Sequence, residues 1–211
     1  MAAQSSEAIV LRTFPLKEAD LIVSYFTRDL GKLRGVAKRA RKPKSPFGSG
    51  LQRLSYVRMF YVHRENRDLD WLDSCEILSS PFDFASDYDV SVALDFLTEA
   101  AELILPAGEP NERFFRLILS VRNYLSEAGA AGVWPAVTYF ALWSAKLSGF
   151  LGPMELNDDE QAIGEEMLTV NLANLTPRVW QRETAVGLRR QLVRSIEEHC
   201  ERRLTTLQYL G

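Results

Sequence analysis

The stretch LIVSYFTRDLGKLRGVAK, residues 21–38, sets the fold of the first third of the chain. Leu21 to Thr27 and Lys32 to Lys38 are short runs rich in β-branched and aromatic residues, which favour strands. Between them lies RDLG, a polar turn that ends in glycine. We therefore predict an antiparallel hairpin over these residues.

Three further runs of strand character surround this hairpin. Residues 8–12 precede it, and residues 54–63 and 69–78 follow it, joined to each other by the polar turn RENR at 64–67. Five strands within about eighty residues, with no long helix among them, are typical of a small closed barrel such as an OB-fold. We predict an OB-fold barrel over residues 1–80.

Beyond Ser79 the alternating pattern gives way to the three- and four-residue steps of amphipathic helices. We expect helices over residues 82–105, 110–128, 134–150 and 178–210, and the third, being the most apolar, should form the centre of the helical core. Residues 149–177 lack helical periodicity and hold a run of acids, so we expect an irregular acidic excursion there. The predicted fold class is α+β, an N-terminal five-stranded OB-fold barrel followed by an all-α helical domain over residues 81–211.

The positive charge of the chain is concentrated in and after the hairpin. Residues 28–58 hold ten basic residues and one acid, whereas the rest of the chain holds 15 basic and 27 acidic residues. Cations at close spacing neutralise phosphates and release counterions, so a polyanion is the natural partner. A solvated basic loop is the alternative. The candidate phosphate-binding residues are Lys32, Arg34, Lys38, Arg39, Arg41, Lys42 and Lys44.

Aromatic residues accompany this basic run, as expected for a groove that holds single-stranded nucleic acid. Tyr25 and Phe60 lie within apolar strands, so we expect them to fill the barrel. Phe47 lies in a loop of Pro, Ser, Gly and Lys, where we expect it to be exposed, either to stack a base or to anchor the loop. Tyr56 is the second candidate for stacking, and Tyr61 lies nearby.

Several classes of function find little support in the sequence. There is no G-x-x-x-x-G-K-[ST] loop, no G-x-G-x-x-G after a strand, and there are only two histidines. Cys75 and Cys200 are too far apart in sequence to suggest a disulfide framework or metal knuckle. Neither a signal peptide nor a membrane-length apolar run is present, so we expect a cytoplasmic protein.

Alternating carboxylates leave a hydrolase as one open alternative. Asp68, Asp70, Asp73 and Glu76 alternate through one predicted strand, with Asp68 and Asp70 on one face. We interpret them mainly as residues that make the strand soluble and repel phosphates from that side. On this interpretation the protein is not an enzyme.

The order of these parts resembles the RecO recombination-mediator family. The resemblance is most specific over EAIVLRTFPLKEADLIVSYFTRDLGKLRGVAKRARKPKS, residues 7–45. It continues more weakly through LQ at 51–52, LS at 54–55, the ring-rich helix ending in Leu147 and Gly149, and HCERRL at 199–204. It implies an OB-fold followed by a helical domain, binding of single- and double-stranded DNA, strand annealing, and recombinase loading together with RecR and the single-strand DNA-binding protein.

The sequence departs from this family in one informative place. Many members carry a four-cysteine zinc module where residues 149–177 lie here, and this chain has no cysteine in that interval. We therefore expect no zinc and no other cofactor. The resemblance implies a nucleoid-associated protein that also holds the acidic C-terminal tail of the single-strand DNA-binding protein. A cation beside an apolar pocket would receive that tail, with Lys146, Arg113, Arg116 and Arg122 as candidates.

One alternative of a different class remains open. The barrel and helices could form an adaptor whose basic loop docks an acidic protein. Arginines of the last predicted helix, including Arg189, are interpreted as a solvated face, with extension of the DNA surface as the other possibility.

Overall fold

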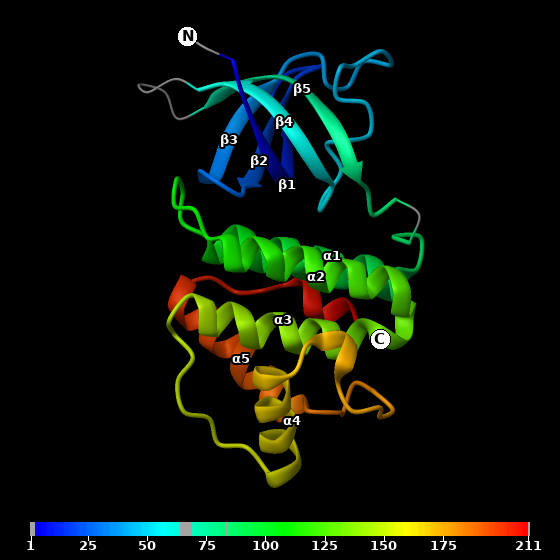
Figure 1. The fold of residues 1–211 in the computed structure, drawn as a ribbon, viewed down its shortest axis with the longest axis vertical. Helices are drawn as coiled ribbons and strands as arrows, with labels where there is room; N and C mark the ends of the chain where they lie inside the picture. Colours follow the sequence, from blue (N-terminus) through cyan, green and yellow to red (C-terminus); the bar gives the residue numbers. More distant parts are fainter. Residues whose placement is uncertain (1–2, 64–68, 83, 211) are drawn as a thin grey trace. The chain divides into compact units, whose positions relative to one another are not determined.

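The computed structural model describes residues 3–63, 69–82 and 84–210. A closed five-stranded barrel at the N-terminus is followed by helices, which confirms the predicted fold class (Figure 1). The chain divides into two compact units. The barrel unit comprises Met1–Asp83 and Leu105–Phe115, and the helical unit comprises Phe84–Ile104 and Arg116–Gly211.

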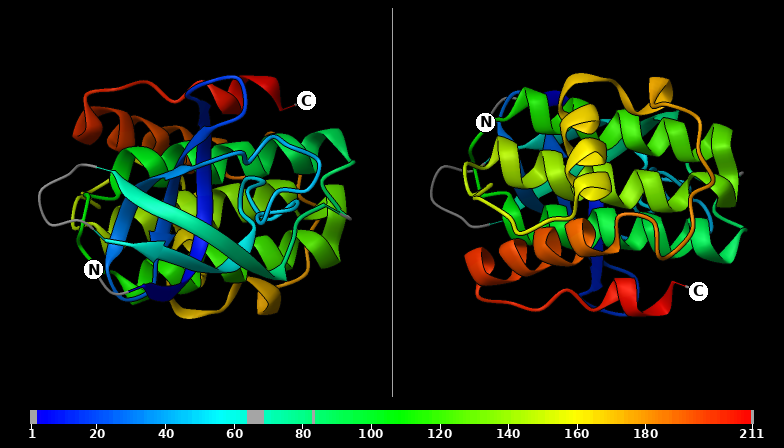
Figure 2. Two further views of the ribbon diagram at one scale, coloured as in Figure 1. Left: turned by 90° about the horizontal axis from the view of Figure 1, so that it is seen from above. Right: turned by 90° about the horizontal axis from the view of Figure 1, so that it is seen from below.

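The barrel contains all five predicted strands. They are β1 (Gln4–Pro15), β2 (Leu21–Thr27), β3 (Gly31–Ala37), β4 (Tyr56–Val62) and β5 (Asp70–Ser79). Neighbouring strands follow the order β1-β2-β3-β5-β4, and β4 closes the barrel on β1 (Figure 2, left). Every pairing is antiparallel except that of β3 with β5. The turn predicted at 64–67 lies outside the described residues.

Strand alternation fills the barrel with side chains from one face of each strand. In β2, Val23 and Tyr25 point inward, whereas Phe26 does not belong to the barrel core. The inward residues form one buried cluster with two residues of the loop between β3 and β4, Phe47 and Leu51. The cluster is thus closed in part by a segment that is not a strand.

The segment Leu105–Phe115 returns to the barrel unit between two helices of the other unit. Phe114 and Phe115 pack on Phe26, with ring centroids 6.3 and 5.8 Å away. The amide of Gly108 donates to the carbonyl of Lys32 at 3.0 Å. The outward ring of Phe26, near the end of β2, is therefore covered by residues distant in sequence, and the three rings form a small second core.

The helical unit is built around its most apolar helix, as predicted. Its helices are α1 (Tyr88–Ile104), α2 (Glu112–Ala128), α3 (Val133–Leu147), α4 (Asp158–Thr169) and α5 (Val186–Cys200), and α2 begins within the barrel unit. α3 contacts α1, α4 and α5. Phe96 of α1 and Phe140 of α3 meet edge to face at 6.2 Å.

Two expectations for the helical unit are wrong. The interval 149–177 was expected to be irregular, but it contains α4, because Asn157 caps the helix by accepting from the amide of Glu160 at 2.9 Å. Acidic residues in its first turn also suit the positive end of the helix dipole. The helix expected over 178–210 is shorter, since α5 spans only Val186–Cys200.

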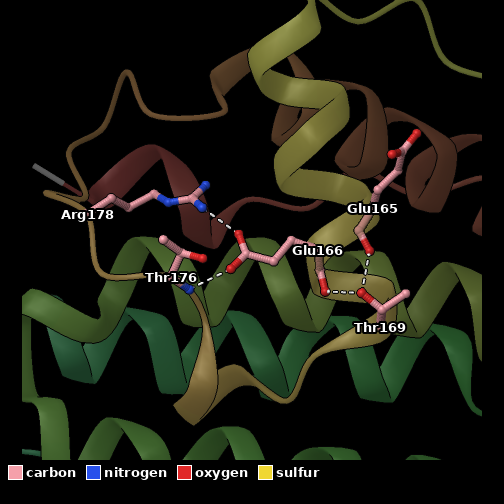
Figure 3. Close-up of polar contacts among 5 residues, drawn as sticks. All are labelled: Glu165, Glu166, Thr169, Thr176 and Arg178. Carbon is pink, nitrogen blue, oxygen red and sulfur yellow. Dashed lines mark hydrogen bonds and ion pairs between the residues drawn. The ribbon is translucent and has the colours of Figure 1, made fainter.

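The chain between α4 and α5 is fastened by one carboxylate. Glu166 accepts from the amide of Thr176 and forms an ion pair with Arg178 (Figure 3). These contacts lower the pKa of Glu166, led by the Thr176 amide. The segment after α4 is therefore held by polar contacts in place of helical hydrogen bonds.

Candidate nucleic-acid interface

The basic loop, defined here as Lys38 to Lys44, directly follows β3 and is fixed through its backbone. The amide of Arg39 donates to the Asp20 carboxylate at 2.9 Å, and the amide of Arg41 donates to the carbonyl of Ala19 at 3.1 Å. Both acceptors lie just before β2, so the loop is tied to the turn between β1 and β2. Its five cationic side chains, Lys38, Arg39, Arg41, Lys42 and Lys44, are all exposed.

Two of the predicted phosphate-binding residues lie on β3 itself. Arg34 is exposed and points away from the barrel interior. Lys32 is half-buried, and its backbone carbonyl takes the hydrogen bond from Gly108. The structure thus brings Arg34 to the same side of β3 as Lys38, and it leaves Lys32 less accessible than its neighbours.

Phe47 corrects one sequence prediction. Its ring was expected to be exposed, but only 2% of the residue is, because it inserts into the barrel cluster. The thiol of Cys75 donates to the Phe47 carbonyl at 3.4 Å, and burial raises the pKa of that thiol to about 11. Phe47 therefore anchors the loop and is not available to stack a base.

The other aromatic residues divide between core and surface. Tyr25 and Tyr61 are buried in the barrel, as expected for Tyr25, whereas Phe60 is 36% exposed and was wrongly expected to fill it. Phe60 points outward because its neighbours Met59 and Tyr61 take the inward positions of β4. Tyr56 is half-buried, donates to Glu7 at 2.6 Å and meets Phe115 edge-on, so its proposed stacking role stays a prediction.

Trp71 of β5 was not among the predicted site residues. The Lys38 ammonium lies over its ring, 4.1 Å from the centroid, a cation–π contact. Trp71 alternates with the buried Leu72, and this period-two signal was available in the sequence. What the sequence could not give is the pairing of β5 beside β3, which places Trp71 opposite Val36.

The alternating carboxylates do not form a shared site among the described residues. Asp70 is buried and accepts from the Tyr25 hydroxyl at 2.9 Å, with His63 Nδ1 at 2.8 Å. Burial and the Asp70 charge raise the pKa of Tyr25. The solubilising role expected for Asp70 is therefore wrong. Asp73 is exposed, Glu76 pairs with Arg58, and Asp68 lies outside the described residues.

The helical candidates also separate by burial. Arg122 is buried with its guanidinium over Phe84 at 5.9 Å, so it is not a surface cation, and burial lowers its pKa. Arg113 and Arg116 are exposed. Lys146 is exposed and lies over the Trp143 ring at 4.7 Å. Lys146 thus lies beside one aromatic ring, and its role in receiving an acidic tail stays a prediction.

Arg189 was interpreted as part of a solvated face, and this is wrong. Only 5% of it is exposed, because its guanidinium lies over Trp134 at 4.4 Å and donates to Thr138 and to the carbonyl of Thr184. Burial lowers the pKa of Arg189 to about 10. It fastens α5 to α3 and does not extend a charged surface.

Neither a metal site nor a membrane segment can be built from the described part of the chain. No group of three or more His, Cys, Asp or Glu side chains there could hold a metal ion. Residues 149–177 contain no cysteine. No described helix has both the length and the apolar character needed to span a bilayer.

Comparison with known proteins gives a consistent result. A family model described as "Recombination protein O N terminal" matches residues 1–81. The chain is 37% identical over 241 aligned positions to the DNA repair protein RecO of Koribacter versatilis, with 98% of each chain covered. It is 38% identical over 127 positions to the DNA repair protein RecO of Thermodesulfovibrio yellowstonii, covering 58% of this chain and 49% of the relative.

A third relative gives a similar partial match. The DNA repair protein RecO of Bifidobacterium animalis subsp. lactis is 38% identical over 128 positions, which is 60% of this chain and 53% of the relative. The chain thus spans nearly the whole length of one relative and about half the length of the other two.

Proposed function

The chain belongs to the RecO family of DNA repair proteins, and on this premise we propose that it acts in repair as a non-enzymatic recombination mediator. It binds single- and double-stranded DNA, promotes annealing of complementary strands and helps to load the recombinase with RecR and the single-strand DNA-binding protein. The barrel unit provides the DNA-binding surface. The helical unit provides the contacts with protein partners.

The basic loop is the observation that carries this proposal. Five exposed cations stand on seven consecutive residues, and backbone hydrogen bonds to Ala19 and Asp20 together with the buried Phe47 fix the course of the chain. Because the backbone is already ordered, binding phosphates costs mainly side-chain entropy. A fixed row of cations suits the regular spacing of charges along a nucleic-acid strand.

This surface supports annealing because it acts on charge. Two complementary strands repel each other through their phosphates, and a common positive face screens that repulsion. Base-edge contacts from a helix in the major groove, which would give sequence specificity, are not part of this surface. We therefore expect binding that depends strongly on salt and only weakly on sequence.

Lys146 and Trp143 support the proposed contact with the acidic tail of the single-strand DNA-binding protein. The indole nitrogen of Trp143 donates to the carbonyl of Met167 at 2.9 Å, which fixes the ring beneath the ammonium of Lys146. A tail that ends in carboxylates and carries apolar side chains would find both a cation and a ring there. For RecR we propose no individual contact residue.

Fluorescence anisotropy with labelled oligo(dT) across a salt series tests the DNA-binding proposal. The variant combines Arg39→Gln, Arg41→Gln and Lys42→Gln, which removes three exposed charges and leaves a polar side chain at each position. We expect weaker binding and a shallower salt dependence, since each lost phosphate contact reduces the slope by about 0.7 on a single strand.

A charge-matched control separates a local site from a general effect of net charge. Arg190→Gln, Arg202→Gln and Arg203→Gln remove the same charge from exposed positions of the helical unit. Equal loss in both variants would mean that the loop is no specific site. Absence of binding by the wild type, with binding of an acidic protein instead, would favour the adaptor function.

A further inference from the structure

An apolar row crosses the outward face of the barrel beside the basic loop. The row comprises Phe14, Ile22, Val36, Trp71 and Val62. Each member is paired with the next across two adjacent strands. Val23, Ala37 and Leu72, which alternate with members of the row, belong to the interior cluster. The row therefore points away from the core.

The two aromatic members of this row, Phe14 and Trp71, are partly accessible. Phe14 is 37% exposed, and Trp71 is half-buried. The rings are separated by three strand spacings, roughly 14 Å along the sheet. Between the two rings lie the half-buried aliphatic side chains of Ile22 and Val36. A span of this length accommodates several nucleotides of an extended strand, which is within the range of OB-fold sites.

Cations lie on both sides of the row. Ser24 is the next outward-facing residue after Ile22 along β2. It is paired with Arg12 on β1 and with Arg34 on β3. Both arginines are exposed, and the Arg12 guanidinium lies 5.7 Å from the Phe14 ring centroid. Lys38 lies on the opposite side, over Trp71. An apolar row bordered by three exposed cations suits a polyanion with aromatic faces better than an apolar peptide.

We propose that this row is a base-stacking site for single-stranded DNA, with unpaired bases on Phe14 and Trp71 and phosphates on Arg12, Arg34 and Lys38. The inference rests on the proposed function and assigns the residues that hold the bases of its single-stranded substrate. In a duplex the faces of the bases are occupied by their neighbours, so only a single strand can use the rings. The basic loop, by contrast, contacts phosphates of either form.

Lys38 has a defined part in this site. In the free protein its ammonium occupies a face of Trp71 that a base would need. A stacking base takes that place, and the released ammonium then holds a phosphate of the same strand. DNA binding thus exchanges the cation–π contact for a stacking contact and an ion pair. In the absence of DNA, Lys38 shields this face of Trp71 from water.

Three probes of equal length test the site by anisotropy: oligo(dT), a fully abasic strand, and a blunt dA·dT duplex. We expect Trp71→Leu and Phe14→Leu each to weaken oligo(dT) binding roughly tenfold, the usual effect of losing one stacked base. Binding of the abasic strand and of the duplex should not change. Phe82→Leu removes a ring that is 68% exposed elsewhere in the barrel unit, and it should bind all three probes like the wild type.

Conservative variants keep the test decisive if Trp71→Leu does not fold. Trp71→Phe retains a ring and should keep most of the affinity for oligo(dT). If oligo(dT) quenches the tryptophan fluorescence of the wild type, the part of that quenching that arises from Trp71 should be absent in this variant. Phe14→Leu, at a partly exposed position outside the core, gives the second measurement.

The outcomes separate the two proposals. Equal losses on the abasic strand, or no loss on oligo(dT), would overturn the stacking site while leaving the DNA-binding function intact. If the wild type bound none of the three probes, the proposed function itself would fail.

Discussion

Phe47 links the packing of the barrel to the shape of the basic loop. Its ring lies among interior residues such as Met59 and Leu72. Its backbone amide is not paired in a strand and donates to the Ser45 hydroxyl at 3.2 Å. Five residues separate it from Arg41, and four separate it from Lys42. The same residue therefore contributes to stability and limits the positions that the cations can reach.

Replacing Phe47 by alanine should lower the free energy of unfolding by about 3–5 kcal/mol, the usual cost of removing a fully buried phenylalanine. Urea denaturation measures the change. Phe60→Ala is the matched control, because the same side chain is 36% exposed there and should cost much less. Similar costs for the two variants would show that Phe47 does not support the barrel.

The burial of Phe47 could not be predicted from its neighbours. Pro46, Gly48 and Gly50 indicate a loop correctly, but the space that receives the ring is formed by strands far away in sequence. The burial of Arg189 was not predicted for the same reason, since its partners Trp134 and Thr138 belong to another helix. Local composition predicts backbone conformation better than it predicts which side chain finds a cavity.

At the scale of elements, one carboxylate of α1 holds the C-terminal segment. Glu99 accepts hydrogen bonds from the amides and hydroxyls of Thr205 and Thr206, just before the final short turn. Burial by itself would raise the pKa of Glu99, but these hydrogen bonds outweigh it and keep the pKa below its ordinary value. Proton uptake by Glu99 must therefore weaken this attachment.

The stability that Glu99 contributes should depend on pH. Its pKa is lower in the folded state, so the contribution is complete above the unfolded value of about 4.3 and is lost as the pH falls through the lowered folded value. We expect the difference in unfolding free energy between wild type and Glu99→Gln to be constant near neutrality and to shrink in acid. Glu127→Gln controls for loss of a surface carboxylate, and an equal pH dependence in that variant would contradict the assignment.

The helices and strands were predictable where one periodic pattern ran without interruption. β2 lies at the predicted bounds, and α3 is the central helix expected from its apolar sequence. α4 was missed because its acids suggested a solvated loop, although Asn157 followed three residues later by Glu160 is a capping signal. α5 was predicted too long because its apolar stripe continues into a segment that Glu99 holds in another conformation.

At the scale of the whole chain, the units are not continuous in sequence. The strands indicated the barrel and the change of period near residue 80 indicated the helices, but no local pattern showed that Leu105–Phe115 belongs to the barrel unit. Its rings Phe114 and Phe115 continue the helical pattern of α2 and pack on Phe26. Such membership is decided by contacts between distant residues, which one sequence does not reveal.

Gly31 tests how strongly this segment is joined to the barrel. Its φ of +77° favours glycine, and a Cβ there would lie 2.3 Å from the carbonyl oxygen of Glu109. Gly31→Ala therefore combines an unfavourable backbone conformation with a clash against main-chain atoms. We expect it to lower the unfolding free energy by about 1–2 kcal/mol for the conformation and a further 1–3 kcal/mol for the clash.

Gly48→Ala isolates the first of these costs. Gly48 also has a positive φ, +51°, but a Cβ there would meet nothing within 4 Å. Urea denaturation of the two variants should therefore differ by the cost of the clash, and hydrogen exchange should place the excess loss of protection for Gly31→Ala in β2 and β3. If both variants lost the same stability, the close approach of Gly31 to Glu109 would have no energetic weight, and Leu105–Phe115 would be joined to the barrel by its phenylalanine rings and the hydrogen bond from Gly108 to Lys32.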